Sequence, residues 1–266
     1  MALVMTPTLS AGALRAEVDP DRGMLVTSLC RDGDELLGPL GIPFLHPWAN
    51  RLSVPLEGAD VPRDEHGLPI HGVHPRAWTV EAHGRTALLA SLDFAAERVF
   101  PHAHRVTQLV RLETWGLRID TTLRSAGTGS VPIAFGFHPY FRLKRDERVA
   151  LPRRRRLLAD ARLIPTGETV AEPAQRQPLG DRSFDDGYAV APGARFAVGD
   201  RLEVALLLGY RYAQIYAPPD EDVICFEPMT APTNALVTGV ALPTAVPGAV
   251  FRAAFEVRVR ARPRGA

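Results

Sequence analysis

Alternation of apolar and polar residues with a period of two is the pattern that most limits how this chain can fold. The clearest case is the C-terminal stretch FRAAFEVRVRAR, in which every second side chain is apolar and most of the others are charged. The apolar set is Phe251, Ala253, Phe255, Val257 and Val259, and the charged set is Arg252, Glu256, Arg258 and Arg260. Successive side chains of a β-strand point to opposite faces, so this stretch predicts a strand with one wet face.

A second long stretch, WGLRIDTTLRS, alternates in the same way. It sets Trp115, Leu117, Ile119, Thr121 and Leu123 against charged or polar neighbours. Shorter apolar or alternating runs occur elsewhere, each bounded by Gly, Pro or Asp, whereas amphipathic helices of twelve or more residues are missing. The chain is therefore expected to be all-β.

The turn residues are spread along the chain. The 24 prolines and 22 glycines do not gather in one linker, which favours many turns between short strands over a domain boundary. We therefore predict one domain over residues 1–266, built as a large antiparallel β-sandwich. Such a sheet can carry a concave face for a small polar ligand.

The charge balance argues against several classes of partner. Lysine and arginine total 31 against 30 aspartates and glutamates, so neither nucleic acid nor an acidic membrane surface is expected as a partner. One basic run, Arg153 to Arg156, could grip phosphate, but without interleaved aromatic residues it favours a solvated edge or loop. No secretory leader and no run of eighteen apolar residues is visible, which predicts a cytoplasmic protein.

The metal-binding and redox residues form no recognisable site. Cys30 and Cys225 are far apart and each lies in an apolar or strand-like stretch, so two buried free thiols are expected. His102 and His104 would share one side of a strand, yet no HExxH helix or cysteine pair accompanies them. The sequence therefore predicts no metal site.

Four stretches contain residues suited to a polar pocket. The stretch FGFHPYFRL places His138 among aromatic residues, where it is either a hydrogen-bonded core residue or an imidazole held as a proton donor. FLHPWANRLS carries Asn50 and Arg51, whose donors and acceptor suit sugar hydroxyls, with the indole of Trp48 nearby. CFEPMTAPTNAL sets Glu227 after a short apolar run, where a carboxylate would emerge at a strand end. The fourth stretch, HGLPIHGVHPRAW, brings His71 beside Gly72, where a ligand could approach the backbone closely.

Taken together and in order, the motifs ANR, HG, FHPYF, FDDGY and FEPMTAP resemble those of the aldose 1-epimerase family, the galactose mutarotases and their glucose-6-phosphate epimerase relatives. The resemblance runs from about residue 20 to the C-terminus. It implies a large antiparallel β-supersandwich, in agreement with the alternation. It also implies an isomerase that acts on a small-molecule sugar without a cofactor.

The resemblance also implies roles for individual residues. His138 matches the general acid that protonates the sugar ring oxygen, and Glu227 matches the general base on the anomeric hydroxyl. Arg51 and His71 match residues that bind the sugar, with Asn50 beside them. Asp185 matches an aspartate that holds sugar hydroxyls, although the neighbouring Asp186 leaves two registers open.

Two positions depart from the family pattern, and they bear on substrate choice. Galactose mutarotases typically carry Asn-His before a small residue and Tyr-Phe, whereas Phe137 precedes and Pro139 follows His138 here. Three functions stay open: an epimerase of a free aldohexose such as glucose or galactose, an epimerase of a hexose 6-phosphate, and a non-catalytic carbohydrate-binding protein. The sequence leaves a monomer and a homodimer equally open.

Overall fold

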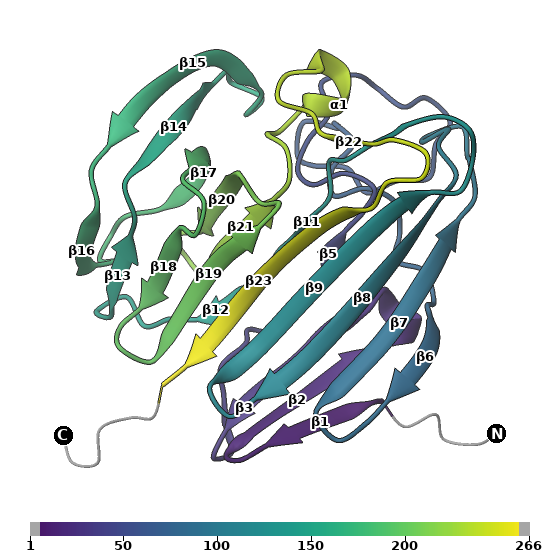
Figure 1. Cartoon of the computed structure of the whole chain (residues 1–266). Coiled ribbons are helices and arrows are strands. Elements are labelled where there is room, and N and C mark those ends of the chain that lie inside the picture. Colours follow the sequence, from purple (N-terminus) through teal and green to yellow (C-terminus); the bar gives the residue numbers. More distant parts are fainter. Residues whose placement is uncertain (1–5, 261–266) are drawn as a thin grey trace.

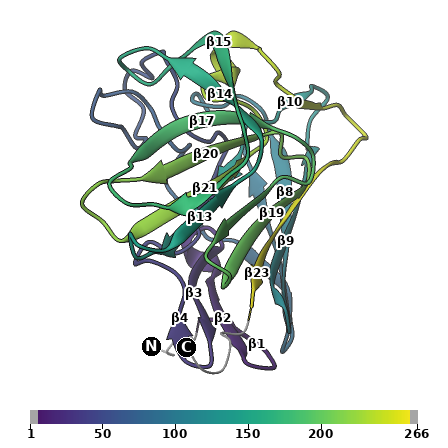
Figure 2. The ribbon, with the colours of Figure 1, turned by 90° about the vertical axis from the view of Figure 1, so that its left-hand side faces the viewer.

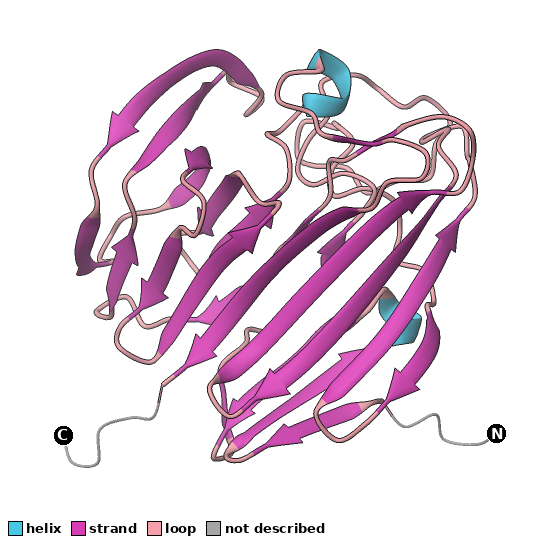
Figure 3. Ribbon diagram, in the orientation of Figure 1, coloured by secondary structure: helices cyan, strands magenta, loops and turns pink. Residues whose placement is uncertain are grey.

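Strands dominate the architecture, as the alternation predicts. The computed structural model describes residues 6–260 (Figure 1). Within that range the helical elements are single turns, the 3-10 helix η1 (Pro20–Arg22) and the helix α1 (Ala235–Thr238) (Figure 3). In the same range no helix has the length and apolar character needed to cross a membrane.

Two large antiparallel sheets form the body of the molecule. The nine-stranded sheet contains, in spatial order, β16 (Gln175–Pro178), β13 (Arg148–Leu151), β18 (Arg195–Val198), β19 (Leu202–Leu208), β23 (Phe251–Val259), β9 (Gly116–Ser125), β8 (His104–Glu113), β7 (Ala87–Phe94) and β6 (Thr79–His83). The eight-stranded sheet contains β15 (Pro165–Glu172), β14 (Arg154–Ala159), β17 (Phe184–Val190), β20 (Tyr212–Ala217), β21 (Val223–Met229), β11 (Gly136–Phe137) and β5 (Phe44–Leu45), with β12 (Tyr140–Arg142) also paired to β21. In Figure 2 the strands β17, β20 and β21 lie to the left of β8, β9 and β23.

Two smaller sheets complete the fold. The N-terminal sheet contains β1 (Thr8–Ala11), β2 (Leu14–Asp19), β3 (Leu25–Arg31) and β4 (Asp34–Glu35), and a two-stranded ribbon contains β10 (Val131–Pro132) and β22 (Thr244–Ala245). The N-terminal sheet packs against β8, at the lower end of the molecule in Figure 1.

The main core lies between the two large sheets. Phe196 of the nine-stranded sheet stacks on Phe226 of the eight-stranded sheet, with ring centroids 5.1 Å apart. Phe137 and Phe255 make a second aromatic contact across the same interface, at 4.9 Å. All four rings are fully buried. Since burying one such side chain stabilises a fold by about 1.5–3 kcal/mol, this interface is a principal source of stability.

The two alternating stretches are strands β9 and β23, although their wet faces are drier than predicted. The prediction that places Trp115 on the apolar face is wrong, because Trp115 lies just before β9 and is 37% exposed, with the guanidinium of Arg258 over its ring at 5.3 Å. Glu256 is buried on β23, because Arg118 and Arg258 pair with its carboxylate from both sides. A cross-strand ion pair and a pair within β23 thus cover a position that the pattern alone assigns to water.

The prediction of a solvated edge for Arg153 to Arg156 is wrong for two members of the run. The side chain of Arg154 is buried, forms an ion pair with Glu172 and lies over the Tyr188 ring at 5.0 Å. Arg156 also contacts Glu172, at 3.2 Å. Arg154 to Arg156 therefore belong to strand β14, and Arg154 contributes to packing. The prediction of two buried thiols holds for Cys225 only, since Cys30 is partly exposed.

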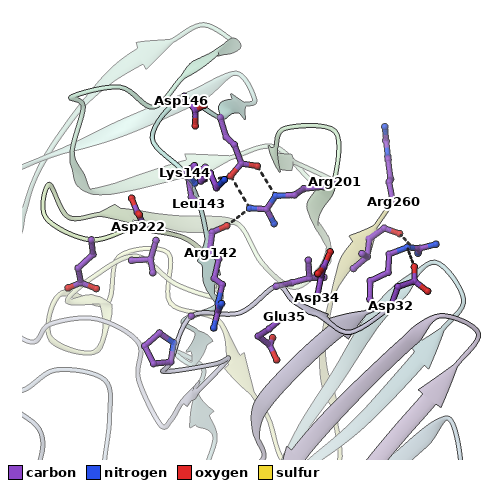
Figure 4. Close-up of a pocket in the computed structure, with 18 residues that line it drawn as sticks. Asp32, Asp34, Glu35, Arg142, Leu143, Lys144, Asp146, Arg201, Asp222 and Arg260 are labelled. Carbon is purple, nitrogen blue, oxygen red and sulfur yellow. Dashed lines mark hydrogen bonds and ion pairs between the residues drawn. The ribbon is translucent and has the colours of Figure 1, made fainter. Parts of the chain in front are cut away.

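A wide cleft of about 960 Å³ lies between the β3–β4 end of the N-terminal sheet and the 142–147 and 221–223 segments. Figure 4 shows Arg142, Lys144 and Arg201 on one side of it and Asp32, Asp34 and Glu35 on the other. Its charged groups largely serve the fold. Arg201 forms an ion pair with Glu147 at 2.7 Å, and Arg142 donates to the carbonyl of Leu37 at 2.8 Å.

Candidate active site

A second cavity, of about 440 Å³, lies on the face of the eight-stranded sheet that points away from the main core. Strands β17, β20 and β21 form its floor, and the 46–73 region and the start of β12 form its walls. The six residues predicted from the sequence all line it, together with seven others. The lining residues are Asn50, Arg51, Arg63, Asp64, Glu65, Ile70, His71, His138, Tyr140, Asp185, Gln214, Tyr216 and Glu227.

The register of the sheet explains which side chains reach this face. Glu227 of β21 is the direct cross-strand partner of Gln214 on β20, and Tyr216 is the partner of Asp185 on β17. Residues paired in this way share one face of a sheet. Asp186 pairs with the buried Ile215 and therefore points to the opposite face, toward Arg156 at 3.6 Å. Asp185 is thus the aspartate that lines the cavity.

The walls are held by short backbone contacts between two segments far apart in sequence. Asn50 and His71 both have left-handed backbone conformations, with φ of 59° and 62°. The amide of His71 donates to the carbonyl of Asn50 at 3.1 Å, and the side chain of Asn50 accepts from the amide of Arg51 at 2.8 Å. Such conformations cost of order 1–3 kcal/mol and persist only when their surroundings fix them. The geometry therefore fixes the positions of Arg51 and His71.

Gly72 serves this packing and not a ligand, which corrects the sequence interpretation. A β-carbon at Gly72 would lie 2.0 Å from the carbonyl oxygen of His46. The close approach is between two loops, since the amide of Val73 also donates to that oxygen at 3.0 Å.

His138 and Glu227 face one another across the floor of the cavity. The Nε2 atom of His138 lies 3.2 Å from Oε1 of Glu227, and the two side chains are almost completely buried. Burial, followed by the nearby Asp185 carboxylate, raises the pKa of Glu227 well above its usual value. Burial, with the neighbouring His71, lowers the pKa of His138 well below 6.5. Desolvation therefore opposes the charged form of both groups.

Aromatic rings hold the imidazole of His138 in place. Tyr140 stacks on it with centroids 4.2 Å apart and planes within 5°. His71 and Tyr216 meet it edge-on, at 5.3 and 5.8 Å. The hydroxyl of Tyr140 is 3.3 Å from Nε2 of His138, and because the rings are parallel it lies over the imidazole face. These rings orient His138. Because His138 lines the cavity, it is not the plain hydrogen-bonded core residue that the sequence left as an alternative.

Arg51 is the hub of a charged network at the cavity wall. Its Nε donates to Asp64 at 2.7 Å, and its Nη2 lies 3.3 Å from Glu65 and 3.4 Å from Asp185. Burial opposes the charged form of Arg51, but the three carboxylates outweigh that effect and raise its pKa. Arg51 is thus a permanent cation that contacts three carboxylates.

Gln214 is a site residue that the sequence analysis missed. Its Nε2 donates to Oδ1 of Asp185 at 2.6 Å, so it fixes that carboxylate. Nothing in the local sequence marks Gln214, because only the sheet register places it beside Glu227. Tyr140, by contrast, stands within the FHPYF motif and could have been named from it.

Several buried polar atoms of this cavity have no hydrogen-bond partner within residues 6–260. They are Nδ1 of His71, Nδ1 of His138, Oε1 of Gln214 and Oε2 of Glu227. A buried polar atom without a partner costs about 1–3 kcal/mol. All four atoms belong to residues of the cavity lining, whose polar side chains suit a small ligand with several hydroxyl groups, each of which can donate and accept.

Three residues singled out from the sequence lie outside the cavity lining. Trp48 is buried in a satellite core cluster with Leu52 and Val61. Phe137 is buried in the main core, and Pro139 is buried without lining the cavity. The two departures from the family motif therefore do not contact the space where a ligand would lie.

The histidine pair considered for zinc forms a different contact. Nε2 of His104 lies 2.7 Å from Nε2 of His46, and Nδ1 of His104 lies 2.6 Å from the carbonyl of His102. Across residues 6–260 no group of three or more histidines, cysteines or acids is arranged to hold a metal ion.

Comparisons with known proteins agree with this architecture. A sequence model described as aldose 1-epimerase matches residues 8–242. A search of curated proteins finds no significant match. Among solved structures, a putative aldose 1-epimerase from Escherichia coli K12 is 22% identical with a TM-score of 0.79, and the alignment covers 96% of this chain and 99% of that one. A galactose mutarotase related enzyme from Lactobacillus acidophilus is 16% identical with a TM-score of 0.81, covering 97% and 98%. At these identities the structures show a shared fold, the mutarotase-like supersandwich.

Proposed function

Because the chain belongs to the aldose 1-epimerase family, we propose that it interconverts the α and β anomers of a free aldohexose such as glucose or galactose. His138 and Glu227 would exchange protons with the sugar. The observation that carries the proposal is the contact of 3.2 Å between these two buried groups in a cavity lined by polar side chains. Ring opening needs one proton removed and another delivered, and this pair offers one group for each transfer.

The steps balance without any proton from the solvent. Glu227 as carboxylate takes the proton of the C1 hydroxyl, a C=O bond forms at C1, and the bond from C1 to the ring oxygen breaks. That oxygen takes a proton from His138 as imidazolium. The aldehyde turns about its C1 to C2 bond, and closure by the reverse transfers returns both side chains to their starting state.

The contact between the two groups also sets the starting protonation. We infer that the pair is neutral before the sugar binds, because burial raises the pKa of Glu227 and lowers the pKa of His138. One proton transfer across their 3.2 Å contact converts that pair into carboxylate and imidazolium. Sugar hydroxyls bonded to the polar side chains of the lining would stabilise the charged form.

The remaining lining residues would position the sugar. Asp185, held by Gln214 and Arg51, presents a carboxylate to hydroxyls, and Asn50 and His71 present donors and acceptors on the opposite wall. A neutral polyol matches this mixture of short-range hydrogen-bonding groups.

The experiment measures anomer interconversion by polarimetry or saturation-transfer NMR in Glu227→Gln and His138→Gln. Each variant should slow the catalysed rate by about 10²–10⁴-fold, because each removes one proton transfer. Circular dichroism spectra that match the wild type would show that the fold is intact. Near-wild-type rates in both variants would refute the proposal, and tight sugar binding without acceleration by the wild type would favour a carbohydrate-binding protein.

A further inference from the structure

The cavity is lined by fewer basic than acidic side chains, and its two arginines differ in their partners. Two cations line it, Arg51 and Arg63, against four acidic side chains. Arg63 donates to the carbonyls of Gly67 and Leu56 and forms no ion pair within the described chain. Arg51 already contacts three carboxylates. Among the described residues that line the cavity, an anionic ligand therefore meets one arginine without a carboxylate partner, the exposed Arg63.

Glu65 differs from the other acids of the cavity in being dispensable for the fold. Asp64 is buried, accepts from the amides of His66 and Leu68, and binds Arg51. The side chain of Glu65 is 61% exposed and contacts Arg51 at 3.3 Å and His66 at 3.7 Å. An exposed ion pair of this kind contributes only about 0–1 kcal/mol to stability.

Glu65 also occupies the part of Arg51 that an anion would need. Arg51 holds Asp64 through Nε and Asn50 through Nη1, so Nη2 is the nitrogen that Glu65 and Asp185 share. Guanidinium groups recognise phosphate through paired N–H donors. With the Glu65 carboxylate on Nη2, that mode of binding is blocked and a negative charge stands in its place.

We propose that Glu65 is a specificity-determining residue that makes the cavity reject anionic sugars, hexose 6-phosphates among them, in favour of neutral aldoses. This inference rests on the proposed function, because it concerns the substrate class of the same site. A cavity of 440 Å³ is only about 9 Å across, so a phosphate anywhere inside it lies within range of the Glu65 charge. At low ionic strength the repulsion of a dianion over that distance corresponds to about a tenfold loss of affinity.

The test compares Glu65→Gln with a matched control, Glu57→Gln. Glu57 is an exposed acid of the same loop region that does not line the cavity. Anomerisation of glucose and of glucose 6-phosphate is followed by NMR exchange spectroscopy at about 20 mM and about 1 M salt. The readout is the ratio of kcat/KM for the phosphate ester to that for the free sugar.

In Glu65→Gln this ratio should rise about tenfold at low salt and less at high salt, where the Debye length falls to about 3 Å. In Glu57→Gln the ratio should stay within twofold of the wild type. A ratio in Glu65→Gln within twofold of the wild type at low salt would overturn the inference. If the wild type fails to accelerate glucose anomerisation, the proposed function fails instead. The role of Glu65 is then decided by the ratio of the dissociation constants of the two sugars, measured by saturation-transfer NMR. A change of about tenfold in Glu65→Gln at low salt supports the inference, and a change within twofold overturns it.

Discussion

Acid should destabilise this protein partly through His71, and the His71→Asn variant should lose less stability on acidification. Burial lowers the pKa of His71 to about 4, with a further contribution from the charge of Arg51. The unfolded chain has the ordinary value near 6.5. Between these two values the unfolded chain binds the proton and the folded chain does not. Lowering the pH through this window therefore favours unfolding.

The two pKa values give the size of the effect. Between pH 7 and pH 5, the titration of His71 should reduce the free energy of unfolding by about 2 kcal/mol. This is an upper bound, because part of the ring is open to the cavity and water there moderates the shift. Asparagine cannot titrate in this range, and it tolerates the left-handed backbone at position 71.

The assay is urea unfolding of both proteins at pH 7 and pH 5, followed by circular dichroism. The stability lost over this range should be smaller in His71→Asn than in the wild type by as much as 2 kcal/mol. His83→Gln, which changes an exposed histidine, should follow the wild type. Equal losses in His71→Asn and the wild type would refute the reasoning, since they would mean that His71 titrates normally in the fold.

Two further predictions concern the same site. Gly72→Ala should lower the free energy of unfolding in urea by more than about 2 kcal/mol, because its β-carbon would clash with the His46 carbonyl at a φ of 84°. The control Gly67→Ala has a φ of 72° and nothing within 4 Å of the added carbon, so it should cost about 1 kcal/mol. Equal costs for the two variants would contradict the clash. As the pH falls, the anomerisation rate should drop to half its maximum below pH 6.5. The catalytic pair stops working when His138 takes one proton more than the pair needs, and burial lowers the pKa of His138. Half-maximal activity at or above pH 6.5 would contradict this.

The alternation of side chains predicts the fold class well, whereas local patterns predict the charged positions poorly. The alternation identifies β9 and β23 because each has one face in the main core. It misplaces Glu256, and the charge pattern misplaces Arg154, because their charges are neutralised by Arg118 and Glu172, which lie elsewhere in the sequence. Local patterns report the hydrophobicity of one segment, whereas the burial of a charge depends on which segments become its neighbours. Such neighbours are fixed by sheet register.

Strand β21 shows how the fold and the site arise from the same alternation. All seven of its residues are buried, which is typical of a strand covered on both faces. Ile224 and Phe226 face the main core, while Cys225 and Glu227 face the opposite side of the sheet, where Glu227 lines the cavity. The sequence predicts Glu227 at the end of a strand, because an acid interrupts an apolar run there, yet it lies inside the strand. Its carboxylate is tolerated there because the second face is covered by a cavity lined with polar groups instead of a second core. Glu227 is thus held by backbone pairing with Gln214 of β20, and the desolvation that raises its pKa is a direct result of its place in the sheet.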